Sequence, residues 1–347
     1  MGEQAVITRL PEPTFKQKIA RSKIEISIGI VTVGVFLVYL IGAPQVFTHY
    51  QIYYSFMTTI PITGILALAL TFVITLGEID MSFPSVMALG GLTMSTVYSN
   101  MSSVDYFGIP PLTLGILAGL GVGILCGLLN SLLIVGFGIP SIVGSIGTQF
   151  FFRGLVNVIA AGAGISMLAA QSGPESGVYF ALAGKIQVTE GARLPMQFLW
   201  FIGLGVLCLV IAKRHRFGLH VSFVGDNKLA AQMMGVNVPR VRITAYVITG
   251  LAAAFAGIVS NLEVAYFYPS QGEDIMLPAL AAVFIGGTSV LGGRGSVVGT
   301  FLGALIMGSL EAGIISLGFD GFWTKVFYGL IIMVSVSVYS FVMKKST

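Results

Sequence analysis

Long apolar segments alternate with short polar ones along almost the whole chain. About 20 apolar residues are needed for an α-helix to cross the hydrocarbon core of a bilayer, and we identify ten segments of roughly that kind. They are residues 26–43, 52–76, 83–98, 112–135, 141–161, 196–212, 243–262, 277–291, 297–317 and 322–343. The pattern predicts an all-α polytopic membrane protein with one transmembrane domain, residues 26–343. The third and eighth segments are short, which leaves open a broken or re-entrant helix packed inside the protein.

The charged residues indicate which ends of the spans face the cytoplasm. Lys and Arg near span ends resist translocation, and the basic clusters lie in residues 1–25, in residues 213–242 and at Lys344 and Lys345. If the number of spans is even and both termini are inside, most of the 18 basic residues are cytoplasmic. We therefore expect a cytoplasmic N-terminal segment (1–25), a cytoplasmic C-terminus and an extracytoplasmic loop at 162–195.

Residues 213–242 form the longest polar interruption of the apolar pattern. Within them, Asp226 is placed to cap a short helix and Gly235 to end it in a left-handed conformation. Leu229 and Met233 are four residues apart and share one helix face. The other small or apolar residues of this stretch are Ala230, Ala231 and Met234. The pattern predicts a short amphipathic helix outside the bilayer, which either rests on lipid headgroups or docks to a cytoplasmic partner.

The loop 162–195 is too polar to span a membrane and is rich in Gly, Ala and Ser. It is long enough to hold a surface helix or a pair of strands. Two interpretations are open: a flexible connector, or part of a docking face for an extracytoplasmic partner.

The composition agrees with a membrane protein and argues against several other functional classes. Hydrophobic residues make up 55% of the 347 and charged residues only 9%, where soluble domains average about 25% charged. The basic residues lie at span ends rather than in one patch, so nucleic-acid binding is not indicated. Cys126 and Cys208 fall inside spans, and the three histidines lack metal-ligand spacing. No catalytic motif and no phosphate-binding G-x-x-x-x-G-K-[ST] occurs, so we expect no catalytic site, metal or cofactor in this chain.

Glycines recur every four residues in two places, which puts them on one helix face. Such ridges allow another helix backbone to approach closely, and close packing is the interpretation we favour over a direct role in conduction. The first ridge lies in the fourth span and the second at the start of the ninth. Their members are Gly115, Gly119, Gly123 and Gly127, and Gly295, Gly299 and Gly303.

Two further polar groups lie in or beside the spans. Glu78 and Asp80 separate the second and third spans. Asp80, with Ser82 and Pro84 following, suits a helix cap at the membrane boundary, and proton coupling by Glu78 is the alternative interpretation. Within the fifth span, one face carries three polar residues spaced at i, i+4 and i+8, and it should point into the bundle or a water-filled path. They are Gln149, Arg153 and Asn157. Substrate-path lining and a structural link between helices remain open for this face.

Several segments carry a resemblance to a known family. They are GEIDMS (77–82), NSLLI (130–134), GIPSIVGSIGT (138–148), FFRGL (151–155), RFGLHVSFVGDN (216–227), a run at 230–258 and a run at 282–308. The chain resembles the permease subunits of bacterial ATP-binding-cassette importers for ribose and other simple sugars, a group related to branched-chain amino acid permeases. The chain departs from the usual family pattern at two positions, Glu78 and Pro84, where glycine is common.

The resemblance implies a permease in the bacterial inner membrane that translocates a monosaccharide or related small polar solute. It implies three kinds of partner: a second permease copy or paralogue, two cytoplasmic ATPase subunits that hold ATP and Mg, and a periplasmic binding protein. Ala230, Ala231 and Gly235 match the A-A-x-x-x-G core of the family's docking loop, which favours docking for the helix in 213–242. The alternative functions are a stand-alone ion-coupled secondary transporter and a structural membrane subunit.

Overall fold

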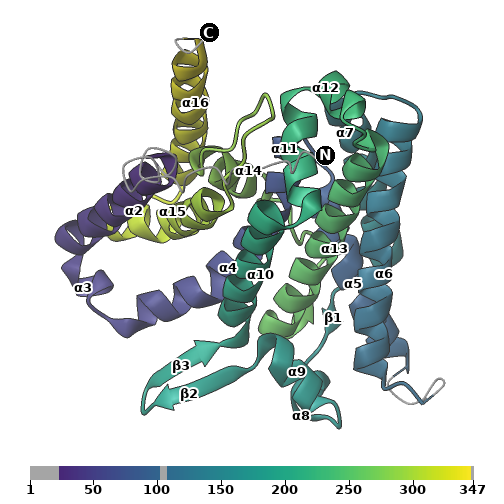
Figure 1. Cartoon of the computed structure of the whole chain (residues 1–347). Coiled ribbons are helices and arrows are strands. Elements are labelled where there is room, and N and C mark those ends of the chain that lie inside the picture. The colour runs from purple at the N-terminus through teal and green to yellow at the C-terminus, as the bar shows by residue number, and fades with distance from the viewer. Residues whose placement is uncertain (1–22, 102–107, 345–347) are drawn as a thin grey trace, which may run out of the picture.

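The computed structural model describes residues 23–101 and 108–344, and within them the chain is mostly helical (Figure 1). A helix occupies each of the ten predicted spans. These helices are α2 (Lys23–Gly42), α4 (Tyr50–Thr75), α5 (Phe83–Met101), α6 (Pro111–Ser131), α7 (Ser141–Ala160), α10 (Met196–Arg214), α13 (Val238–Val264), α14 (Met276–Ile285), α15 (Val297–Ser316) and α16 (Trp323–Lys344). Apart from its last residues, the predicted N-terminal segment 1–25 lies outside the described residues.

Seven helices of the described part are long and apolar enough to cross a membrane. Of the ten, α5 and α14 do not qualify by length and composition, and for α16 the count includes only Trp323–Ser335. The eighth span was predicted to run to residue 291, but its helix, α14, ends at Ile285. The reason is local: Gly287, Gly292 and Gly293 have φ values of +79°, +89° and +80°, so the chain turns away. Ten helical residues reach about 15 Å, half of a bilayer core, so α14 is a half-span.

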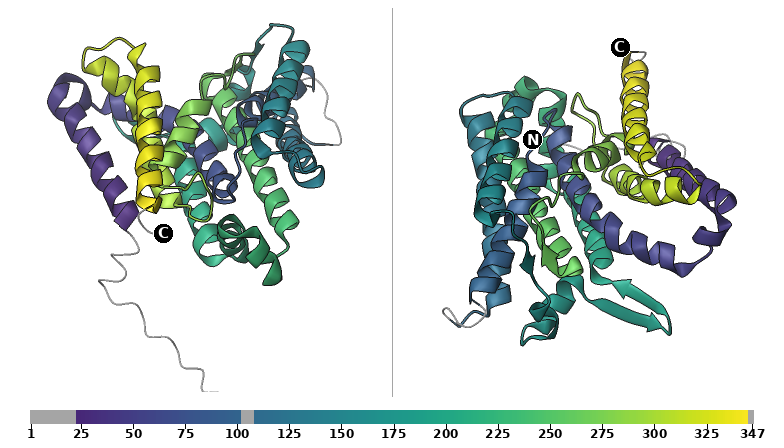
Figure 2. Two further views of the ribbon diagram at one scale, coloured as in Figure 1. Left: turned by 90° about the horizontal axis from the view of Figure 1, so that it is seen from above. Right: turned by 180° about the vertical axis from the view of Figure 1, so that it is seen from behind.

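The helices form two flanks around a buried centre (Figures 1 and 2). The flank of α2, α15 and α16 lies on one side, and α6 and α7 lie on the other, with α4, α5, α10 and α13 between them. The centre is the most buried part: α13 packs on α4, α5 and α6, and 78% of the most apolar window of α4 is buried. A helix that is apolar all round belongs in such an interior.

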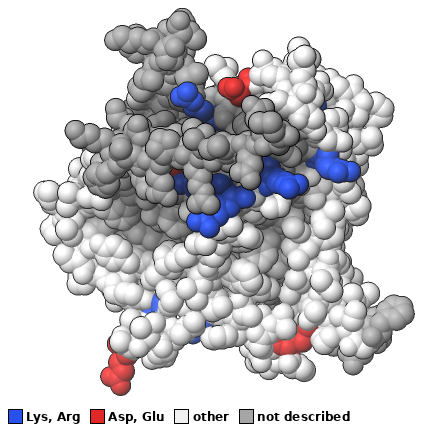
Figure 3. Space-filling view, in the orientation of Figure 1, with Lys and Arg blue, Asp and Glu red and all other residues white. Residues whose placement is uncertain are grey.

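Two short helices, α11 (Arg216–Asp226) and α12 (Lys228–Met233), lie between α10 and α13. We call the end of the molecule that carries them the basic end. Figure 3 shows several Lys and Arg side chains in a band across the middle and upper part of the face seen in Figure 1. Lys213 and Arg214 belong to the basic end, in the last turn of α10, where positive charge stabilises the helix dipole.

The opposite end, which we call the hairpin end, is formed by the segment 162–195. It contains β1 (Ile165–Ser166), α8 (Ala169–Ser172), α9 (Ser176–Ala183), β2 (Lys185–Thr189) and β3 (Ala192–Pro195). The strands β2 and β3 pair as an antiparallel hairpin, and β1 pairs with β4 (Tyr266–Phe267). Glu175 accepts hydrogen bonds from the N–H groups of Leu112 and Thr113 at 2.6 and 2.8 Å. This acid therefore ties the segment to the N-terminus of α6, a favourable position for negative charge.

Candidate functional site

The short helix predicted in the polar loop is present, but its cap is not the predicted one. Asp226 is the last residue of α11. Asn227 caps α12 instead: its backbone is extended, and its side-chain oxygen accepts a hydrogen bond from the N–H of Ala230 at 3.0 Å. The prediction of Asp226 as cap was therefore wrong by one residue. Gly235 follows α12 with φ +82°, the left-handed conformation expected at that position.

The helix α12 presents an apolar face to the outside. Leu229, Met233 and Met234 are 68%, 84% and 62% exposed, and Ala230 is exposed as well. Ala231 alone among the predicted residues is fully buried, in a cluster that includes Val224 and Tyr246. The helix is thus anchored by one small side chain while its large apolar side chains point away from the protein. Three exposed large hydrophobic side chains on this short helix and its C-terminal cap, Met234, form the kind of patch that binds a partner.

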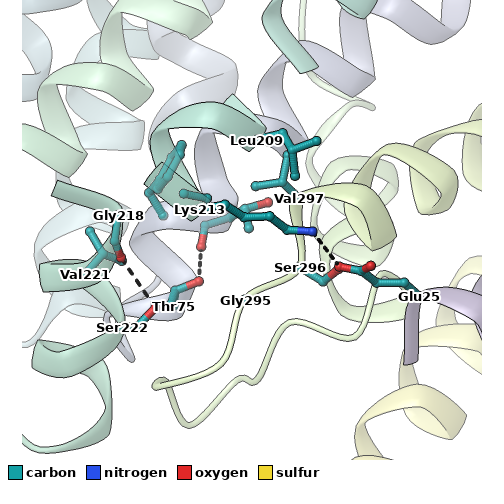
Figure 4. A pocket seen from close by; sticks show the side chains of 13 residues that line it. Glu25, Thr75, Leu209, Lys213, Gly218, Val221, Ser222, Gly295, Ser296 and Val297 are labelled. Atoms are coloured by element: carbon teal, nitrogen blue, oxygen red, sulfur yellow. Dashed lines mark hydrogen bonds and ion pairs between the residues drawn. The ribbon is translucent and has the colours of Figure 1, made fainter. Parts of the chain in front are cut away.

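A small pocket of about 80 Å³ lies beside α11 (Figure 4). Its edge holds an ion pair of 3.6 Å between Lys213 and Glu25, and the hydroxyl of Ser296 lies 3.4 Å from the same carboxylate. These contacts tie α2, α10 and the start of α15 together at the basic end. The pocket is far below the roughly 300 Å³ of the smallest usual ligand sites, so we assign it to packing.

The first glycine ridge lies against two helix backbones. A Cβ atom on Gly115 or Gly119 would lie 2.7 Å from a carbonyl oxygen of α5, contributed by Met94 and Gly90 respectively. On the same ridge, Gly123 and Gly127 would meet carbonyl oxygens of α13 at 2.5 and 2.6 Å. Contacts this close leave no room for a side chain, so the ridge lets α6 pack against both α5 and α13.

The second ridge lies against α14 and α4. Cβ atoms on Gly299 and Gly303 would collide with the carbonyl oxygens of Gly286 and Ala282. Gly295, which precedes α15, lies against the hydroxyl of Thr75 instead. The half-span α14 is therefore packed directly on the backbone of α15.

Three chain segments meet through their backbones near α11. The N–H of Gly293 donates to the carbonyl oxygen of Thr75 at 2.8 Å. A Cβ on Gly292 would lie 2.8 Å from both the oxygen of Gly225 and the nitrogen of Gly77. This backbone junction joins the end of α4, the end of α11 and the loop after α14.

The segment between α4 and α5 forms a buried polar network. One oxygen of Asp80 accepts hydrogen bonds from the N–H and the hydroxyl of Ser82 at 2.8 and 2.7 Å, so Asp80 supports the start of α5. Asn130 of α6 donates to the Ser82 hydroxyl at 2.7 Å, and Thr148 of α7 donates to Asn130 at 2.6 Å. Burial raises the pKa of the Asp80 carboxyl, and the hydrogen bonds from Ser82 oppose that shift.

Glu78 has a different environment from its neighbour. Its side chain is paired with Lys228 of α12 at 3.3 Å and with Arg242 of α13 at 2.5 Å. Neither partner was predicted from the sequence, because Lys228 and Arg242 lie far along the chain and no local spacing connects them to Glu78. The excess of basic residues in 213–242 was the only signal that could have suggested them.

The polar face of α7 is mostly engaged with protein backbone. Arg153 donates to the carbonyl oxygens of Pro269 and Gln271, both at 2.9 Å. The Gln149 amide, with its nitrogen turned toward α5, lies 3.0 Å from the carbonyl oxygen of Met81. Asn157 is exposed on the same helix. The carbonyl partners of Arg153 are those expected of a structural link, and path lining by these three residues stays a prediction.

A cavity of about 1180 Å³ opens among α4, α5, α13, α14, α15 and α16. It exceeds the roughly 300–1000 Å³ of typical small-molecule sites. The residues that line it come from the parts of these helices nearest the hairpin end and from the segment 268–275. Hydroxyl groups on its wall belong to Ser55, Thr58, Thr59, Thr63, Ser260, Tyr268, Ser270, Thr324 and Tyr328. Gln149, Arg153 and Asn157 are not among its lining residues.

The cavity also carries more acidic than basic side chains. Its carboxylates are Glu263, Glu273, Asp274 and Glu311, and its basic residue is Lys325. Two of the acids are paired: Glu263 with Lys185 of the hairpin at 3.6 Å, and Asp274 with Lys325 at 3.2 Å. The hydroxyls of this wall can donate hydrogen bonds to a polar, uncharged solute, and both the hydroxyls and the carboxylates can accept hydrogen bonds from it. In the part of the chain that the structure describes, no cluster of His, Cys, Asp and Glu could hold a metal ion.

Comparison with known proteins places this architecture in a family. The family model described as the branched-chain amino acid transport system permease component matches residues 52–336, which run from the first turn of α4 into α16 and include the backbone junction and the cavity. This chain belongs to that family. It is a multi-pass inner-membrane protein with a role in transport. No solved structure gives a significant match.

Individual relatives cover most of the chain. The fructose import permease protein of Rhizobium meliloti is 30% identical over 82% of this chain and 76% of its own length. The ribose import permease protein of Bacillus subtilis is 31% identical over 81% and 82%. An inner membrane ABC transporter permease protein of Escherichia coli is 31% identical over 89% and 90%.

Proposed function

We propose that this chain is the permease subunit of an ATP-driven importer for a monosaccharide or a related small polar solute. Family membership supports a permease, and the relatives named for fructose and ribose import support a sugar. The observation that carries the coupling to ATP is the exposed apolar face of α12, formed by Leu229, Met233 and Met234. The permease itself hydrolyses nothing: ATP and Mg belong to a separate subunit.

The basic end then faces the cytoplasm, as the positive-inside rule requires, and both termini lie there. We propose that α12 inserts its three large apolar side chains into a cytoplasmic ATPase subunit. Closure of two such subunits around ATP would displace α12 in each of two permease copies, or in a permease and its paralogue. Because α12 is held by the buried Ala231, that displacement would move the ends of α11 and α13 with it.

The hairpin end then faces the periplasm, where we propose that a binding protein delivers the solute. The segment 162–195 would form part of its docking face. The large cavity lies on this side, and its hydroxyl and carboxylate groups suit a sugar, whose hydroxyls both donate and accept hydrogen bonds. A weak membrane site is sufficient, because the binding protein would supply the affinity.

The proposal predicts a simple biochemical outcome. The chain is purified with a candidate ATPase subunit and binding protein, reconstituted in liposomes and supplied with radiolabelled ribose or fructose. Uptake that requires ATP and all three components supports the proposal. Uptake driven by a proton or sodium gradient, by the chain alone, would instead support a secondary transporter and refute it.

A further inference from the structure

Glu78 occupies a position that is unfavourable for a carboxylate on two counts. The residue is 3% exposed, and burial of an unpaired charge is costly. It also follows directly on the C-terminus of α4, since its N–H donates to the carbonyl oxygen of Val73 at 3.2 Å. The C-terminal end of a helix carries partial negative charge and repels a carboxylate. A negative charge kept here must be balanced by positive groups.

The balancing charges come from two separate elements. Lys228 stands in the first turn of α12, and Arg242 lies near the start of α13. Both contact the same oxygen, Oε1 of Glu78. Arg242 is largely covered, whereas half of the Lys228 side chain remains exposed. One buried carboxylate therefore joins the end of α4 both to the first turn of α12 and to the start of α13.

The segment that holds Glu78 is in turn fixed to the opposite flank. Next to it, the N–H of Ile79 donates to the hydroxyl of Ser141 at 3.2 Å, and the hydroxyl of Ser145 lies 3.2 Å from the carbonyl oxygen of Ile79. Both serines belong to α7. Through Ser82 and Asn130 the same segment is bonded to α6. Residues 77–82 thus connect α12 and α13 on one side with α6 and α7 on the other.

From this arrangement we propose that Glu78 is a positioning residue for transport, which holds α12 to the membrane-embedded helices so that its displacement is transmitted to them. The inference rests on the proposed function. Without the ion pairs, α12 would remain attached through Ala231 and its two flanking turns, and it could move while residues 77–82 stay still. The ATPase would then turn over without changing the membrane helices.

A test should measure directly whether the displacement of α12 reaches the membrane-embedded helices, and it should not depend on knowing the solute. Cys126 and Cys208 are replaced, and Thr59→Cys is introduced as a reporter in the cavity wall. The purified permease–ATPase complex is treated with a water-soluble maleimide, with and without ATP plus vanadate. We expect nucleotide to change the labelling rate of this complex about tenfold or more. Glu78→Gln keeps the shape of the side chain but removes its charge.

In the Glu78→Gln complex we expect retained ATPase activity and a nucleotide effect on labelling of about twofold or less. Lys228→Gln removes one of the two ion pairs at a half-exposed position, and it should also reduce the nucleotide effect on labelling. If Glu78→Gln does not assemble with the ATPase, Lys228→Gln serves as the test of the positioning role. Glu25→Gln is the matched control, because it removes a carboxylate that pairs with Lys213 at the same end without touching α12.

Three results would overturn the inference. A full nucleotide effect in both Glu78→Gln and Lys228→Gln would show that the ion pairs transmit nothing. A parallel loss of assembly, ATPase activity and labelling change would show a merely structural role. Absence of any nucleotide effect in the reference complex would refute the proposed function, and the positioning role with it.

Discussion

Gly123 of α6 and Gly250 of α13 meet backbone to backbone: a Cβ atom on Gly123 would lie 2.5 Å from the carbonyl oxygen of Gly250. We predict that Gly123→Leu forces the two helices apart and destabilises the protein by at least about 1–3 kcal/mol, the usual cost of overpacking. The melting temperature in detergent measures the effect. Gly121→Leu is the control on the same helix, since a Cβ there meets nothing within 4 Å. Equal shifts for the two variants would contradict the packing role.

A second prediction concerns the exposed face of α12. Leu229→Asp or Met233→Asp should abolish co-purification of the ATPase subunit, because either places a charge where an apolar contact is proposed. Both side chains are more than half exposed, so the permease itself should insert and melt as before. Val188→Asp, at an equally exposed apolar position of the hairpin end, should leave the ATPase bound. Undiminished ATPase recovery with Met233→Asp would rule the docking face out.

The solute path can be located by thiol labelling in a background without Cys126 and Cys208. We predict that Thr59→Cys in the cavity wall reacts with a water-soluble reagent at a rate that depends on nucleotide state. Asn157→Cys on the polar face of α7 should react at a constant rate, because that face does not line the cavity. The opposite pattern would place the path along Gln149, Arg153 and Asn157, as the sequence alone allowed.

Arg153 should matter for the segment 268–275, which forms part of the cavity wall. Its guanidinium binds the carbonyl oxygens of Pro269 and Gln271, and hydrogen bonds to charged groups contribute about 1.5–3 kcal/mol each. We predict that Arg153→Met lowers the melting temperature and speeds hydrogen exchange in 268–275. Arg193→Met, on the hairpin, should leave exchange in that segment unchanged. A normal exchange pattern in Arg153→Met would mean that other contacts hold the segment.

The sequence predicted the features that depend on local periodicity. A helix lies at each apolar segment, the glycines spaced by four face backbone except for Gly295, and Gly235 adopts the left-handed conformation. These features follow from residues close together in the chain. The cap of α12 was misassigned because Asp and Asn are nearly equivalent as caps, and only the extended backbone of Asn227 distinguishes them.

Features that depend on distant contacts could not be predicted. The pairing of Glu78 with Lys228 and Arg242 joins segments that lie far apart in the sequence. Several other basic residues of 213–242 were equally plausible partners for Glu78. The cavity is formed by six helices and a loop, so no single segment carries its signature. The end of α14 at Ile285 was missed for a local reason: the uncharged residues 286–291 were counted as part of the span, although they include Gly286 and Gly287, where the backbone turns.

The backbone junction near α11 changes how mutagenesis of this protein should be interpreted. A Cβ atom at Gly225 or Gly295 would collide with the carbonyl oxygen or the hydroxyl of Thr75, and one at Gly292 would lie 2.8 Å from two backbone atoms. Alanine scanning is designed to delete side-chain atoms, yet at these positions it would insert one. A defect found there would reflect a steric clash between the added methyl group and a neighbouring chain segment, and it would say nothing about a missing functional group.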